Sequence, residues 1–129
     1  RGFYSNLIKV HRNPGGRSIL VSVKKGSRTL TFLNIYVPNQ AQETCLSTTL
    51  HERLGSAGEN VVVGGNLNLV WDPAMDRHTT HFQGTGAMSN LLKKEITQAG
   101  LVDAWRYLHP DKRDYTYCSH VHSSYSCID

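Results

Sequence analysis

Hydrophobic and polar residues alternate in the first half of the chain, which is the pattern of β-strands with one buried face. Residues 18–23 and 30–37 are rich in apolar residues interrupted by single polar ones and are read as strands, and residues 24–28 between them contain a glycine that favours a hairpin turn. Three consecutive valines at 61–63 are typical of a buried strand. We therefore predict three strands in this half of the chain.

Leucines recur at every fourth position in residues 40–54, which predicts a helix with one apolar face. A second helix is predicted at 90–99, with Ser89 as its N-cap. The other predicted elements are a helical turn and two strands, at residues 103–108, 115–119 and 124–129. Strands that alternate with helices indicate the α/β or α+β class.

The composition is that of one ordinary globular domain at most. The chain has 129 residues, of which 39% are hydrophobic and 19% charged, as in folded soluble domains. No apolar run approaches the roughly 18 residues that a membrane-spanning helix requires. We therefore expect no membrane partner.

The charge balance is moderately basic, with a formal net charge of +4. Basic residues are concentrated near the start of the chain, at Lys9, His11, Arg12, Arg17, Lys24, Lys25 and Arg28. Such a cluster is compatible with binding to a phosphate backbone. It is also compatible with a solvated hairpin of mixed charge, and charge alone favours that second interpretation.

The three cysteines, Cys45, Cys118 and Cys127, are odd in number and irregularly spaced. This argues against a disulfide framework and for a reducing compartment. Cys118 and Cys127, with His120 and His122 between them, also suggest zinc ligands, but the spacing is not one of the usual zinc signatures. An exposed hairpin is the favoured interpretation, and we predict no metal ligands in this chain.

Two glycines and two asparagines follow the valine strand. Gly64 and Gly65 would end the strand and let the main chain approach a neighbour closely, and an extended chain would point Asn66 and Asn68 in the same direction. Two convergent polar groups at the end of a strand form a candidate site. The alternative is an Asn-rich turn without function.

Five short motifs in a fixed order resemble those of one enzyme superfamily. The family patterns are I-Y-x-P-N, G-D-F-N, L-x-D-x-W/Y-R-x-L-H-P, Y-T-F/Y-x-S and Y-S-x-I-D-H, and their counterparts are residues 35–39, 65–68, 101–110, 115–119 and 125–129. On these residues the chain resembles the endonuclease/exonuclease/phosphatase superfamily. It is most similar to the endonuclease domain of LINE-type (non-LTR) retrotransposon polyproteins.

The resemblance implies an α/β (α+β) fold, a fragment of a four-layer α-β-β-α sandwich with two packed sheets. The family domain is nearly twice as long, so residues 1–129 are expected to be an incomplete endonuclease-like domain. Strand edges left unpaired in such a fragment would favour self-association.

The resemblance also implies roles for particular residues, because family members hydrolyse DNA phosphodiesters with Mg²⁺. Tyr36 would approach the scissile phosphate, Asn39 would organise the site, and Asn68 would donate to a phosphate oxygen. Asn66 stands where the family has an aspartate that handles the nucleophile or its proton. An amide cannot act as that general base.

Three further positions carry over from the family. Thr116 would lie near the DNA backbone, and Arg77 would contact DNA or form a surface salt bridge. Asp129 would orient a catalytic histidine that in the family lies beyond it. That histidine and the family's metal-binding glutamate have no counterpart in the matched motifs.

Three functional hypotheses follow. The chain is an endonuclease-like domain of retrotransposon origin, intracellular in the cytoplasm or nucleus, that has lost its Mg²⁺-dependent activity. Alternatively, it is a non-catalytic nucleic-acid-binding module whose partner is DNA, or a remnant reused as a structural, self-associating protein.

Overall fold

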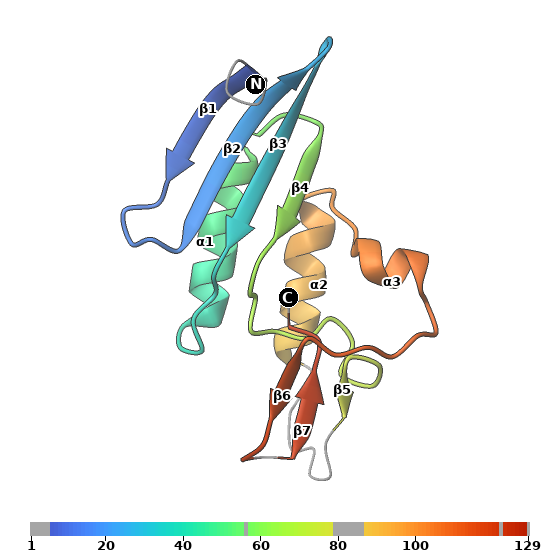
Figure 1. Ribbon diagram of the computed structural model, residues 1–129. Coiled ribbons are helices and arrows are strands. Elements are labelled where there is room, and N and C mark those ends of the chain that lie inside the picture. The colour runs from blue at the N-terminus through green and yellow to red at the C-terminus, as the bar shows by residue number, and fades with distance from the viewer. Residues whose placement is uncertain (1–5, 56, 79–86, 122, 129) are drawn as a thin grey trace. The chain divides into compact units, whose positions relative to one another are not determined.

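A computed structural model describes residues 6–55, 57–78, 87–121 and 123–128. Within them the chain has two sheets and three helices (Figure 1). The chain divides into two compact units, Arg1–Asn66 and Leu67–Asp129. The fold is α+β, which confirms the class predicted from the sequence.

The first unit is a four-stranded sheet with a helix on one face (Figure 1). The strand order is β1-β2-β3-β4, with β1 Leu7–Arg12, β2 Ser18–Lys25, β3 Arg28–Ile35 and β4 Val61–Gly64. The first three strands are antiparallel, whereas β3 and β4 are parallel and are connected through α1, Gln42–Leu54. A parallel pair requires such a crossover connection.

The core of the first unit includes one face of β3 and one face of α1. Leu33 and Ile35 are 1% exposed, while Phe32, which directly precedes Leu33, is 45% exposed. Helix α1 contributes Leu46 and Leu50, which lie one turn apart and are both buried. The leucine spacing therefore located the buried face of α1 correctly.

Strand β1 was not predicted from the sequence. All six of its residues are exposed, so no alternation of buried and exposed positions marks it. It is held by an antiparallel ladder with β2 that is irregular between Leu7 and Lys9. Main-chain hydrogen bonds to β2, rather than burial of its side chains, hold β1 in the sheet.

The second unit has a small sheet and two helices. Its elements are β5 Arg77–His78, α2 Ala87–Gln98, α3 Ala104–Leu108, β6 Tyr117–Ser119 and β7 Ser124–Ser126, and the sheet order is β5-β7-β6. The prediction that Ser89 caps α2 is wrong. The helix begins two residues earlier, and Ser89 lies buried within its first turn.

Candidate functional site

Tyr36, Asn39 and Asn66, which we call the strand-end cluster, follow the carboxyl ends of β3 and β4 in the first unit. Because the two strands are parallel, their carboxyl ends lie at the same edge of the sheet. The chain stays paired beyond them, since the Val37 amide donates to the Asn66 main-chain oxygen at 2.8 Å. The structure therefore brings the segments that contain Tyr36 and Asn66 together.

The Tyr36 side chain of the strand-end cluster is exposed to solvent, while the next residue, Val37, is buried in the core and holds the main chain in place. Val37 is 0% exposed, whereas the adjacent Tyr36 is 47% exposed. The Tyr36 amide donates to the Arg17 oxygen at 2.7 Å, which fixes its main chain. Asn39 is exposed and Asn66 half-buried. The phenol of Tyr36 is thus accessible to a ligand.

Gly65 is required where the two segments meet. Its φ of 126° is a conformation that side chains rarely adopt, and a Cβ there would clash with the main-chain oxygen of Ile35. The predicted close approach of the main chain at Gly65 is confirmed.

The prediction that Asn66 and Asn68 point the same way through strand alternation is wrong. Strand β4 ends at Gly64, and Asn68 has a left-handed φ of 52°. The extended conformation that would produce alternation is therefore lost between the two asparagines. Asn66 ends the first unit and Asn68 belongs to the second.

Asn68, Arg77 and Thr116, which we call the junction cluster, gather beside the segment 126–128 in the second unit. The Leu67 amide donates to the Ile128 oxygen at 2.9 Å, which fixes the chain next to Asn68. Arg77 pairs with Ser126 in the sheet. These contacts bring together three positions that lie far apart in the sequence.

Thr116 has two contacts with the same segment. Its amide donates to the Ser126 oxygen at 3.0 Å, and its hydroxyl accepts from the Ile128 amide at 3.1 Å. A hydroxyl that accepts one bond still has a proton to donate, and Thr116 is exposed. The Thr116 hydroxyl can therefore donate a hydrogen bond to a ligand oxygen. Asp129, the remaining predicted residue, lies outside the described residues.

Asp76 is a buried structural residue rather than part of a surface pair with Arg77. It is 3% exposed and forms an ion pair with Arg106 of α3. Its other carboxylate oxygen accepts from the Asp72 amide at 2.8 Å, and its main-chain oxygen accepts from the Cys127 amide at 2.9 Å. Asp76 thereby connects the chain next to Arg77 with the segment that follows β7.

Arg106 is a central residue that the sequence reasoning missed. One nitrogen of its guanidinium donates to the main-chain oxygens of His109, Pro110 and Lys112, at 3.2, 3.1 and 2.9 Å. A second nitrogen binds Asp76. The only signal in the sequence was the arginine within the motif at 101–110, whose pattern gave no indication of its partners.

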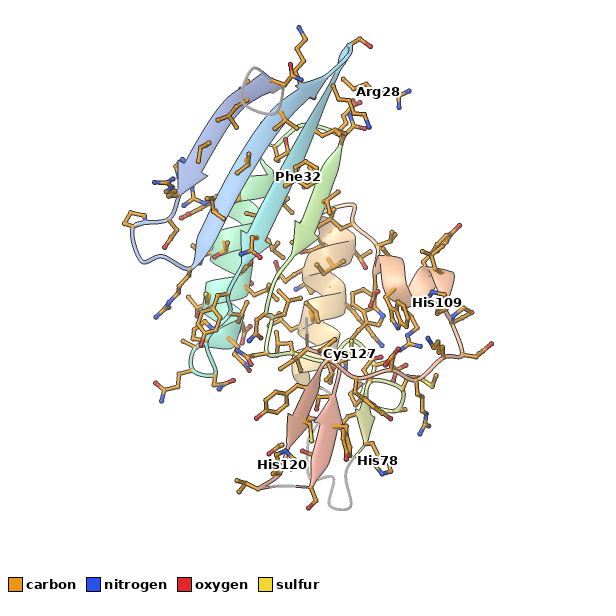
Figure 2. All side chains as sticks on the ribbon, viewed as in Figure 1. Arg28, Phe32, His78, His109, His120 and Cys127 are labelled. Carbon is orange, nitrogen blue, oxygen red and sulfur yellow. The ribbon has the colours of Figure 1, made fainter. Side chains whose placement is uncertain are left out.

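The described cysteines and histidines of residues 118–127 do not form a metal site. Cys118 and His120 are exposed at β6 and the turn after it, and Cys127 is half-buried (Figure 2). His122 lies outside the described residues. Among those that the structure describes, no three His, Cys, Asp or Glu side chains gather as metal ligands.

The candidate residues that the structure describes do not fit a magnesium ion. Mg²⁺ is bound in proteins chiefly by carboxylates together with water and phosphate. The strand-end cluster supplies a phenol and two amides, and the junction cluster supplies an amide, a guanidinium and a hydroxyl. A neutral or positive donor set of this kind suits phosphate oxygens better than a cation.

The basic residues near the start of the chain are all exposed. They lie on β1, β2 and β3 and in the connections between them: Lys9, His11, Arg12, Arg17, Lys24, Lys25 and Arg28. Of the helices in the described ranges, none is long and apolar enough to cross a membrane.

The fold matches a solved structure of an endonuclease domain. That structure is the endonuclease domain of TRAS1, a telomere-specific non-LTR retrotransposon, and it superposes with a TM-score of 0.58 at 15% identity. The chain shares the fold of this endonuclease domain. The match covers 95% of the chain and 54% of the TRAS1 domain, so the chain spans about half of that domain's length.

The fold that the five motifs implied is therefore confirmed. No protein-family model matches the chain. At 15% identity the likeness to the TRAS1 domain establishes fold alone, because one fold can carry many activities.

Proposed function

We propose that residues 1–129 are part of an endonuclease-like domain of non-LTR retrotransposon origin that binds DNA without cutting it. The fold likeness to the TRAS1 domain and the five ordered motifs support the origin. The observation that carries DNA binding is the junction cluster, where a guanidinium, an amide and a hydroxyl gather beside the segment 126–128. These groups are common phosphate donors.

Asn66 supports the loss of hydrolysis. The resembled family has a carboxylate at this position, whereas an amide cannot accept the proton of an attacking water. General acid–base catalysis is worth about 10²–10⁴ in rate. A chain with Asn66 would retain the phosphate donors of the site and lack this contribution.

Nicking of supercoiled plasmid tests the inactivity. We expect the chain to produce no more nicked circles with Mg²⁺ than with chelator or buffer. Metal-dependent nicking that persists after repurification would contradict the proposal and would mean that another residue acts as the base.

The salt dependence of DNA affinity tests the binding. The dissociation constant for a labelled duplex, measured by fluorescence anisotropy, should rise steeply with salt because counterions are released. Replacing Arg77 by Gln should lower the log–log slope by about 1. Lys94→Gln, which removes the same charge from an exposed position of α2, is the control. An affinity that is insensitive to salt would contradict phosphate binding.

Self-association is a second candidate function, supported by the edges of the first sheet. Strand β4 is an outer strand, and Val62 on it is 58% exposed. Exposed outer strands can pair with another chain. Sedimentation velocity should then show a concentration-dependent dimer that Val62→Lys removes, and a monomer at all concentrations would contradict it.

A further inference from the structure

Three aromatic rings form a continuous row across the small sheet of the second unit. His78 of β5 lies opposite Tyr125 of β7, with ring centroids 6.4 Å apart. Tyr115, just before β6, lies on the other side of Tyr125 at 5.8 Å. We call these three residues the aromatic face.

The aromatic face is open to solvent. Tyr125 is 46% exposed, His78 is exposed, and Tyr115 is half-buried. Large aromatic side chains usually bury most of their surface. A contiguous group of them left accessible indicates a binding surface more strongly than a single exposed ring does.

The surroundings of the aromatic face offer donors to a polyanion. Arg77 directly precedes His78 on β5, and because it pairs with Ser126 while His78 pairs with Tyr125, its side chain leaves the opposite face of this edge strand. The imidazole of His120 lies in the turn after β6, at the same end of the sheet as His78 (Figure 2). Asp114, which directly precedes Tyr115, forms an ion pair with Lys112 at 3.5 Å, and the sequence from Tyr115 to Ile128 contains no Asp or Glu. The nearest acidic residue along the chain to His78 is Asp76, whose charge is paired with Arg106.

We propose that the aromatic face binds the unpaired bases of single-stranded DNA by stacking. This inference rests on the proposed DNA binding, in which Arg77 and Thr116 contact phosphates, and adds a preference for single strands over duplex. Stacking requires an accessible π-face, which an unpaired base offers and a base inside a duplex does not. Thr116 directly follows Tyr115, so a phosphate donor and a stacking ring lie next to each other.

Tyr125→Leu in the full chain tests the proposal, because it retains apolar volume and removes the ring. Anisotropy would compare a labelled oligothymidylate with a labelled duplex of the same length. We expect affinity for the single strand to fall about 5- to 140-fold, the range for loss of one stacked base, and affinity for the duplex to stay unchanged. Tyr125→Phe, which keeps the ring and controls for sheet integrity, should bind like the native chain.

Tyr107→Leu is the matched control, since Tyr107 is 79% exposed on α3 and lies outside the aromatic face. Photocrosslinking with a 5-iodouracil oligonucleotide adds an independent readout, expected at His78, Tyr115 or Tyr125. Unchanged single-strand affinity in Tyr125→Leu, equal losses for both DNAs, or crosslinks only at other positions would overturn the stacking inference and leave phosphate binding standing. Absence of binding to either DNA would overturn both proposals.

Discussion

The two units of this chain are stabilised in different ways. In the first, long main-chain ladders join β1, β2 and β3, and the buried side chains are mostly aliphatic. In the second, strands of two or three residues are supplemented by side chains that bond to the main chain, above all Arg106. Apolar burial is non-directional, whereas each bond of Arg106 requires one particular geometry.

This difference bears on function. The junction cluster lies in the second unit. There Asp76, which directly precedes Arg77, forms an ion pair with Arg106 and accepts a hydrogen bond from the Cys127 amide, in the segment beside Thr116. A polar network can hold surface loops in one arrangement, but it depends on each member. The second unit should therefore respond sharply to loss of a single polar group.

The largest expected effect is that of Arg106→Met. The substitution leaves the Asp76 carboxylate, whose side chain is 4% exposed, without its cation. Breaking a buried pair in this way costs about 3–5 kcal/mol. Both tryptophans, Trp71 and Trp105, belong to the second unit. Urea unfolding followed by tryptophan fluorescence therefore measures the free energy of unfolding of this unit. A loss no larger than that of the exposed control Arg113→Met would contradict the role given to Arg106.

Leu33→Ala is the corresponding change in the first unit. Leu33 is 1% exposed in β3, and truncating such a leucine costs about 2–5 kcal/mol. Far-UV circular dichroism during urea unfolding should register the loss, while the tryptophan transition of the second unit moves less. Ile8→Ala, at a position that is 55% exposed, is the control. Equal shifts of both transitions would mean that the units unfold as one.

Thr31→Val tests whether the first unit also depends on a polar contact. The buried Thr31 hydroxyl donates to the Ala57 oxygen at 2.8 Å and lies 3.0 Å from the Ser22 hydroxyl. Valine would leave the Ala57 oxygen without this donor, at a cost of about 1–3 kcal/mol. Thr29→Val, exposed on the same strand, should be neutral in the same circular dichroism experiment. Similar stabilities of the two variants would show that apolar burial alone determines this unit.

Asp103→Ala has the smallest expected effect. The Asp103 side chain accepts from the Arg106 amide at 2.9 Å and caps α3. Loss of an N-cap costs about 1 kcal/mol, and tryptophan fluorescence should detect it through Trp105 in the same helix. The exposed Asp111→Ala controls for the loss of charge. If both variants unfold at the same urea concentration, the cap does not contribute.

Much of the first unit could be predicted because its patterns are local. The apolar runs of β2 and β3 gave these strands their approximate bounds, and the leucine spacing gave α1 both its bounds and its buried face. Strand β1 was missed because none of its residues is buried. Strand β5 was missed because two residues are too few to show a period.

For the candidate site, the sequence could name individual residues but could not predict which of them lie close together. The parallel pairing of β3 with β4, which places Tyr36 and Asn66 at one edge of the sheet, was not predicted. The partner of Asp76 could not be predicted, since Arg106 lies 30 residues away in the sequence. Nor could the row of rings in the aromatic face, which depends on the pairing of β5 with β7.

The sequence by itself determined the class of fold and the apolar face of α1, and it raised the hypothesis that Asn66 stands where the resembled family has a carboxylate. These follow from residue type and local period, which do not depend on distant partners. Only the tertiary structure decided that Asn68, Arg77 and Thr116 meet beside the segment 126–128, and that Asp76 binds Arg106. Strand register and directional hydrogen bonds set these contacts, and both depend on how segments far apart in the sequence are brought together.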